Sequence, residues 1–126
     1  MAGRSWADAI LGFNYVKPNY PSRSAHVCNA GFVVPVRHRG MRAGLALGRA
    51  FVQFAPLLGY SASVFNLVYA SNAASLRIWD KLGFQRVGLI PKAGRLKRPN
   101  NNNGQAGEQE EDFVDAVVYY REFATQ

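Results

Sequence analysis

The sequence predicts an α/β (α+β) fold, in which helices flank a mixed, mostly antiparallel sheet. Its polar and apolar runs follow the order strand, strand, helix, strand, helix, strand, strand, without internal repeats. The strand–helix–strand unit at the centre predicts one parallel pair with a right-handed crossover, and the flanking strands predict antiparallel pairs. With 126 residues and 48% hydrophobic content, residues 1–126 fit a single domain with a real core.

The first two strands are expected at Ala9–Val16 and Ala25–Val34 and should pair antiparallel. The first should end before the turn-rich segment Lys17–Pro21, because proline cannot donate to a strand ladder. Gly31 interrupts the second strand and indicates either a β-bulge or a close backbone approach.

A helix is expected over Met41–Leu58, where apolar residues recur at helical spacing. Gly59 suits the position that follows a helix end, and Pro56 can distort the last turn. The next segment, Tyr60–Tyr69, is apolar at most positions and predicts a central strand.

The second helix is expected over Ala73–Leu82, with Asn72 as its N-cap and Gly83 at its end. The last two strands are expected at Phe84–Ile90 and Phe113–Tyr120, as an antiparallel pair. Between them lies the polar, low-complexity segment 99–111, which predicts a flexible loop.

The formal net charge of +7 favours an anionic partner. Much of the positive charge lies in two clusters: Arg37, Arg39, Arg42 and Arg49, and later Lys92, Arg95, Lys97 and Arg98. Such clusters suit one compact polyphosphate at least as well as a long nucleic acid. The Arg95–Arg98 run is expected to be a solvated loop.

Cys28 is the only cysteine, which excludes an internal disulfide and favours a reducing compartment. No apolar run approaches the ~20 residues that a membrane helix needs. The N-terminus lacks the apolar core of a secretory signal. These features favour the cytoplasm, with mitochondria and nucleus left open.

The loop Arg37–Gly44 joins a predicted strand to a predicted helix, is basic and contains two glycines. Such a loop turns main-chain N–H groups outward at the positive end of the helix dipole, where a phosphate can bind. Because short glycine motifs produce many false positives, the loop needs a second motif to support it.

That second motif lies at Asn72–Phe84. It resembles the block N-x-x-[AS]-x-x-[LI]-[YW]-x-K-x-G-F of the Gcn5-related N-acetyltransferases (GNAT superfamily), and Arg37–Arg42 resembles their acetyl-CoA loop, Q/R-x-x-G-x-G/A. The resemblance extends from Gly12 to the last strand. It implies a GNAT-like sheet whose central parallel pair splays to admit acetyl-CoA. It also implies that the strand and two helices that usually open this fold are missing here.

Several segments are similar to the fungal proline-analogue N-acetyltransferases: Tyr15–Tyr20, Cys28–Phe32, Ala55–Tyr60, Phe65–Val68 and Ile78–Leu82. Those enzymes acetylate the ring nitrogen of azetidine-2-carboxylate and related cyclic imino acids. The resemblance therefore implies acetyl-CoA-dependent acetylation of a small amine or imino acid. Arg42 departs from the broad loop pattern, and its charge can reach a phosphate instead. Trp79 replaces a tyrosine that protonates the departing thiolate, which indole cannot do.

The same resemblance implies site residues. Asn29 and Asn66 are the candidates for substrate positioning and catalysis, since an amide both donates and accepts. A bond from the side chain to the main chain is the competing explanation for each. The candidates for binding acetyl-CoA are Phe32, Val34, Arg37, Arg39, Gly40, Arg42, Ala43, Gly44 and Asn72. Val34 and Val68 are expected to face the cleft.

His26 and Cys28 are not expected to be catalytic, because no third partner is visible and the GNAT family uses no covalent intermediate. His38 is expected to be a solvated loop residue or a phosphate contact. No cluster of His, Cys, Asp and Glu has the spacing of metal ligands, so no metal is expected.

Two other functions stay open. Because the chain starts almost directly at the first of these strands, it is also interpreted as a truncated CoA-binding module without turnover, or as a chain whose pocket a second subunit completes in a homodimer. A basic nucleic-acid-binding domain is the other reading of the charge, although no helix-turn-helix, zinc-finger or RNP pattern occurs.

Overall fold

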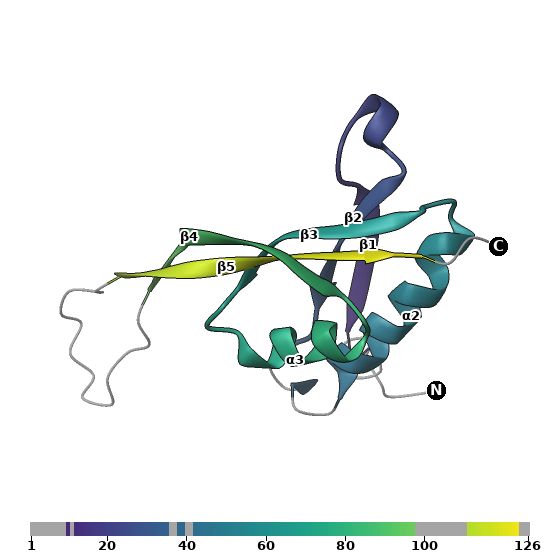
Figure 1. Cartoon of the computed structure of the whole chain (residues 1–126). Helices are drawn as coiled ribbons and strands as arrows, with labels where there is room; N and C mark the ends of the chain where they lie inside the picture. The colour runs from purple at the N-terminus through teal and green to yellow at the C-terminus, as the bar shows by residue number, and fades with distance from the viewer. Residues whose placement is uncertain (1–9, 11, 36–37, 40–41, 98–110, 124–126) are drawn as a thin grey trace, which may run out of the picture.

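The computed structural model describes residues 10, 12–35, 38–39, 42–97 and 111–123. In these ranges five strands form one sheet in the order β1-β2-β3-β5-β4, and both α-helices lie on the same face of it (Figure 1). The mixed, mostly antiparallel sheet predicted from the sequence is confirmed. The elements are β1 (Phe13–Pro18), the 3₁₀-helix η1 (Ser22–Ser24), β2 (Val27–Val33), α2 (Ala43–Leu57), β3 (Ala62–Tyr69), α3 (Ala73–Lys81), β4 (Gln85–Lys97) and β5 (Glu111–Glu122).

β1 and β2 form an antiparallel pair at one edge of the sheet. β1 begins later than predicted and continues through Lys17 and Pro18. The Asn19 N–H donates to the Val27 carbonyl oxygen at 2.8 Å, so alternation turns the Pro18 nitrogen away from β2. The prediction that the strand stops before Pro18 is wrong because an edge strand tolerates proline on its outer side.

Gly31 of β2 lies against the ring of Tyr15 in β1. A Cβ atom built on Gly31 would come within 2.3 Å of that ring. The register between these two strands is unbroken. Of the two explanations for this glycine, the close approach is confirmed and the bulge is wrong.

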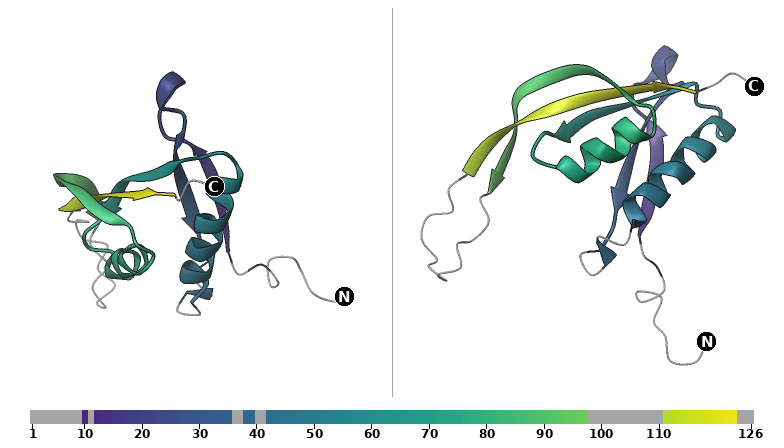
Figure 2. Two further views of the ribbon diagram at one scale, coloured as in Figure 1. Left: turned by 45° about the vertical axis from the view of Figure 1, so that its right-hand side comes forward. Right: turned by 60° about the horizontal axis from the view of Figure 1, so that its bottom comes forward.

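β2 and β3 are the predicted parallel pair, but they are hydrogen-bonded only at one end. The register pairs are Val27 with Ala62 and Cys28 with Ser63, and beyond them the strands diverge (Figure 2). β3 occupies the centre of the sheet, as predicted. The divergence leaves the facing edges of both strands without a strand partner.

A β-bulge interrupts the antiparallel ladder between β3 and β5. The register shifts between Phe65 and Val68. Two residues of β3, Asn66 and Leu67, therefore lie opposite a single residue of β5, and the strand bends there.

Helix α2 begins at Ala43 and not at the predicted Met41, which lies outside the described residues. Its N-cap, Arg42, has a φ of 60°, a left-handed conformation that cannot continue into an α-helix. The end of the helix agrees with the prediction, since Gly59 follows with a φ of 99°. Pro56 lies inside the last turn.

Helix α3 has the predicted caps. The side chain of Asn72 accepts a hydrogen bond from the Ser75 N–H at 3.2 Å, and Gly83 follows the helix with a φ of 85°. No helix in the described part of the chain is long and apolar enough to cross a membrane.

β4 continues to Lys97, well past the predicted end at Ile90. After an irregularity between Ile90 and Gly94, pairing with β5 resumes. The last pair between β3 and β5 is Tyr69 with Ala116. Beyond it, β4 and β5 extend together as an arm (Figure 1). Sequence alone missed this extension because a partner strand, not apolar composition, maintains it.

The arm corrects the interpretation of the second basic cluster. Arg95 lies in β4 and forms an ion pair with Glu111 of β5, so the predicted solvated loop is wrong for residues 95–97. Arg98 lies outside the described residues. The predicted flexible loop 99–111 also lies outside them, except for Glu111, which begins β5.

The core lies between the sheet and the two helices and is largely aromatic. Phe65 of β3 is at its centre: its ring centroid lies 4.5 Å from Trp79 of α3, 4.9 Å from Phe84 and 5.7 Å from Phe51 of α2. Offset and tilted ring pairs of this kind add stability beyond simple burial. They hold the helix-facing side of β3 in place beside the point where β2 diverges.

Candidate active site

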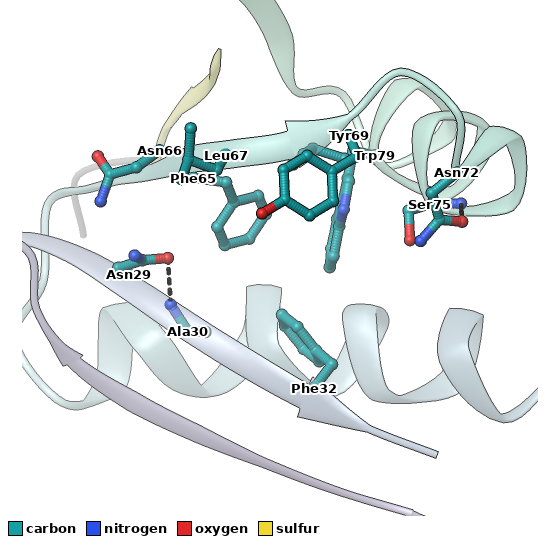
Figure 3. Close-up of a pocket in the computed structure, with 11 residues that line it drawn as sticks. Asn29, Ala30, Phe32, Phe65, Asn66, Leu67, Tyr69, Asn72, Ser75 and Trp79 are labelled. Atoms are coloured by element: carbon teal, nitrogen blue, oxygen red, sulfur yellow. Dashed lines mark hydrogen bonds between the residues drawn. The ribbon is translucent and has the colours of Figure 1, made fainter. Parts of the chain in front are cut away.

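A cavity of about 400 Å³ opens where β2 and β3 diverge (Figure 3). Its size falls within the range of small-molecule sites. β2 and β3 supply its walls, and the first turns of α3 close one end. The lining residues are Asn29, Ala30, Phe32, Phe65, Asn66, Leu67, Val68, Tyr69, Asn72, Ser75 and Trp79.

Asn29 lies on β2 just after the last residue that pairs with β3. Its Oδ1 accepts a hydrogen bond from the Ala30 N–H at 2.8 Å. The His26 carbonyl oxygen accepts from the Ser61 N–H on the β3 side, and strand alternation points the main-chain groups of Ala30 to the same side. The Asn29 side chain thus satisfies an N–H that β3 no longer reaches.

Asn66 stands on the bulge of β3 and is bonded to Asn19, which follows β1. Asn19 Nδ2 donates to Asn66 Oδ1 at 3.0 Å, and Asn66 Nδ2 donates to Asn19 Oδ1 at 2.7 Å. Asn66 and Asn29 lie across from each other at one end of the cavity (Figure 3). Both therefore take part in internal hydrogen bonds, as the competing explanation from sequence expected for Asn29.

These bonds leave the two side chains with donors to spare. The oxygens of Asn29 and Asn66 already accept one hydrogen bond each. Among the described residues, both N–H groups of Asn29 and one of Asn66 have no acceptor. This end of the cavity is therefore suited to bind an oxygen-rich, anionic group.

The N-terminus of α2 is open and lacks negative charge. Its N-cap makes no side-chain capping bond, and its first turn has no acidic residue. The first helical bond runs from the Ala46 N–H to the Arg42 carbonyl oxygen at 3.1 Å. The N–H groups of Ala43 and Gly44 therefore have no main-chain acceptor among the described residues, which favours an anion there.

The structure brings only part of the predicted site into one cavity. Phe32 and Asn72, both predicted to bind acetyl-CoA, line it together with Asn29 and Asn66. Asn72 also caps α3, so the two roles expected for it are compatible in position.

The other residues predicted to bind acetyl-CoA do not line the cavity. Of the two valines expected to face the cleft, Val68 lines the cavity, but Val34 does not, because β2 ends before it. The Val34 carbonyl oxygen accepts a hydrogen bond from Arg39 Nε at 3.3 Å. Arg37 and Gly40 lie outside the described residues.

The chain is similar in sequence to two known proteins. No protein-family model matches the chain. It is 44% identical over 122 residues to N-acetyltransferase aca1 of Schizosaccharomyces pombe, a match that covers 97% of this chain and 53% of that protein. It is 40% identical over 92 residues to Protein SPT10 of Saccharomyces cerevisiae, which covers 73% of this chain and 14% of that protein. The chain thus spans about half the length of aca1.

Solved structures agree in fold. A GCN5-related N-acetyltransferase from Kribbella flavida superposes with a TM-score of 0.74 at 30% identity, over 89% of this chain and 60% of that one. This chain has the GNAT fold. The yncA structure from Salmonella typhimurium, with its cofactor acetyl-CoA, superposes with a TM-score of 0.72 at 18% identity, over 92% of this chain and 60% of that one.

Trp79 forms the inner wall of the cleft of this GNAT fold. It is 7% exposed, and its ring centroid lies 5.0 Å from Phe32 and 4.5 Å from Phe65. Trp79 is therefore part of the aromatic core as well as of the cavity lining. Its packing shapes the cavity.

Asp80 ties α3, and with it one end of the cleft, to the sheet. The Tyr119 hydroxyl donates to Asp80 Oδ1 at 3.0 Å, and Arg86 Nη2 donates to Asp80 Oδ2 at 2.6 Å. The hydrogen bond from Arg86 is the main reason that the pKa of Asp80 is lowered from its usual value, and the bond from Tyr119 adds to it.

The histidines and the cysteine do not form a catalytic group. Cys28 is fully buried, and this burial raises the pKa of its thiol, which disfavours the thiolate. His26 is exposed on the turn before β2. His38 differs from the expected solvated residue, because its Nε2 is buried without a hydrogen-bond partner among the described residues.

Sequence reasoning missed residues that the fold brings to the cleft. Tyr69 and Ser75 line the cavity, and Asn19 bonds the Asn66 side chain. Asn19 belongs to a segment that resembles the proline-analogue enzymes, but its spacing from Asn66 carries no signal of contact.

Proposed function

We propose that this chain is a GNAT-type N-acetyltransferase that moves an acetyl group from acetyl-CoA to the ring nitrogen of a cyclic imino acid. The 44% identity to N-acetyltransferase aca1 supports the reaction class. The observation that supports the substrate class is the pair Asn29 and Asn66, which both line the cleft and keep N–H groups without an acceptor among the described residues.

The residues present fit acetyl-CoA. The open N-terminus of α2, without acidic residues in its first turn, suits a diphosphate. Arg42, the N-cap residue, adds positive charge there, and the diverging strands β2 and β3 offer unpaired main-chain groups to an extended part of the cofactor. When bound, acetyl-CoA supplies an activated acetyl thioester, and the chain's part is to hold an amine next to it.

The asparagine pair suits a carboxylate on the acceptor. Each side-chain oxygen already accepts one hydrogen bond within the protein, whereas three N–H groups of the pair have no acceptor among the described residues, so donors are the larger part of what the pair offers to a ligand. A carboxylate held by Asn29 and Asn66 would fix the neighbouring ring nitrogen in one orientation. An imino acid such as azetidine-2-carboxylate has both groups.

The described lining of the cavity contains no Asp, Glu, His or Lys. In this proposal the substrate amine reacts in its neutral form. We expect kcat/KM to rise with pH until the amine is deprotonated. A rate that does not change between about pH 7 and pH 9 would contradict this mechanism.

The decisive experiment compares two substrates that differ by one group. Acetyl-CoA consumption is measured with azetidine-2-carboxylate and with azetidine, which lacks the carboxylate. We expect turnover of the first and at least about tenfold lower kcat/KM for the second, because unpaired donors penalise the analogue. Equal turnover of both would contradict the assignment of the asparagine pair.

A CoA-binding module without turnover is the second candidate. The observation that favours it is the N-terminus of α2, which suits a diphosphate whether or not an acetyl group is transferred. It predicts that CoA raises the melting temperature while no amine is acetylated. That combined outcome would replace the enzyme proposal.

A further inference from the structure

Asn19 contacts the side chain of Asn66 from outside the cavity. The two carboxamides exchange two hydrogen bonds, of 3.0 Å and 2.7 Å, in a closed ring. In such a pair each amide must keep its oxygen and its N–H group opposite their counterparts, so both amide planes are fixed.

The main chain holds Asn19 in place. The Asn19 N–H donates to the Val27 carbonyl oxygen at 2.8 Å and extends the β1–β2 ladder by one residue. The preceding Pro18 restricts the backbone further. Asn19 is half-buried, whereas Asn66 is exposed. Asn19 is therefore the anchored member of the pair, and Asn66 is the member that it holds.

Asn66 depends on this support because of where it stands. It lies on the bulge of β3, next to the edge that β2 has left. Without Asn19, its side chain would be free to sample several rotamers about χ1 and χ2. With Asn19 in place, its oxygen and one N–H are occupied and a single N–H remains for a ligand.

We propose that Asn19 is a positioning residue for acetyl transfer: it holds the Asn66 carboxamide so that the remaining N–H meets the carboxylate of the imino acid. Asn19 does not line the cavity and acts through Asn66. The inference rests on the proposed function, which it deepens by naming what orients the substrate-binding amide.

A double-mutant cycle tests this role. Asn19→Ala is expected to lower kcat/KM for azetidine-2-carboxylate by about tenfold, mainly through KM, because the substrate contact is lost and not the chemical step. In an Asn66→Ala background the same substitution should have no further effect. Calorimetric titration of the CoA complex with azetidine-2-carboxylate gives a readout without turnover, and Asn19→Ala should raise its Kd by about tenfold.

Three outcomes would overturn the inference. The first is an equal loss from Asn19→Ala in the wild-type and Asn66→Ala backgrounds. The second is an equal loss with azetidine, which has no carboxylate to bind. The third is an active wild-type protein whose Asn19→Ala variant is unchanged. A wild-type protein that acetylates no imino acid instead defeats the proposed function itself.

Matched variants separate positioning from folding. Asn14→Ala removes an asparagine of β1, whose Nδ2 donates to the Leu47 carbonyl oxygen at 3.4 Å, and should leave kcat/KM unchanged. If Asn19→Ala does not fold, Asn19→Asp keeps an acceptor for Asn66 but loses the donor. The decrease in kcat/KM caused by Asn19→Asp should vanish in the Asn66→Ala background. A decrease that comes from the added charge alone would persist there and contradict the inference.

Discussion

The two edges of β3 differ in how their main chain is satisfied. On one edge β3 pairs with β5 from Ala62 to Tyr69, with a single bulge between. On the other edge it pairs with β2 at two positions only. Beyond these, side chains take over: Asn29 caps a main-chain N–H of β2, and Asn19 holds Asn66.

The difference separates stability from binding within one strand. The paired edge and the aromatic face bury Phe65 and hold the strand rigid. The unpaired edge is satisfied by amides that keep spare donors, and it faces the cavity. Substitutions on the first side should therefore unfold the protein, and substitutions on the second should chiefly impair binding.

The largest effect is expected from Phe65→Ala on the aromatic side. Phe65 is 5% exposed, and its loss should lower the free energy of unfolding by about 3–5 kcal/mol, measured by urea denaturation. Phe113→Ala is the matched control, since Phe113 of β5 is 61% exposed and should cost about 0.5 kcal/mol or less. Similar decreases in the free energy of unfolding for the two variants would contradict the view that the aromatic face of β3 is the stabilising side.

On the unpaired edge, Asn29→Ala and Asn29→Asp should separate the two tasks of one side chain. Alanine leaves the Ala30 N–H without its acceptor and should lower stability by about 1 kcal/mol, whereas aspartate still accepts that bond. Neither variant can donate to a carboxylate, so both should lower kcat/KM for azetidine-2-carboxylate by about tenfold or more. An active Asn29→Asp enzyme would show that the donors of Asn29 are not used.

A smaller effect is expected at the N-terminus of α2, where one added negative charge should raise stability and weaken CoA binding. Ala46 is exposed near the first turn, so Ala46→Glu should stabilise the helix by about 0.3–1 kcal/mol through its dipole. The same charge should weaken CoA binding by up to about fivefold, measured by calorimetry. Ala46→Gln, which is uncharged and of the same shape, should do neither. Tighter CoA binding by Ala46→Glu would argue against a diphosphate at this helix end.

The smallest effect concerns the pH dependence of the α3 attachment. Because the folded-state pKa of Asp80 is lowered by Arg86 and Tyr119, its contribution to stability is present above the unfolded pKa of about 3.9 and is lost as the pH falls through the folded pKa. Asp80→Asn should therefore narrow the difference in melting temperature between neutral and acidic solution. The change should be small, since the ion pair is exposed. If Asp80→Asn leaves that difference unchanged, other carboxylates and not Asp80 cause the loss of stability in acid.

Local chemistry made much of the fold predictable. Asn72 and Gly83 delimit α3 as expected, and Gly59 follows α2. The strand–helix–strand order correctly predicted the parallel pair. These features depend on residues close together in sequence. The ends of β1 and β4 were misjudged, because Pro18 is tolerated on an edge and because β5 carries β4 past Ile90.

The candidate site was predictable only in part. The resemblance to known enzymes pointed to Asn29 and Asn66, and the structure brings both to one cavity. Asn19 was not predicted, since its bond to Asn66 joins residues 47 positions apart. Val34 was expected in the cleft but lies past the end of β2.

By itself, the sequence determined which segments form helices and strands, the N-cap of α3, and the glycines that follow both helices. Only the tertiary structure decided where β2 leaves β3 and which side chains replace the missing ladder. The physical reason is that caps and periodicity act over a few residues, whereas the divergence of two strands depends on aromatic packing from both helices and on pairing with β5.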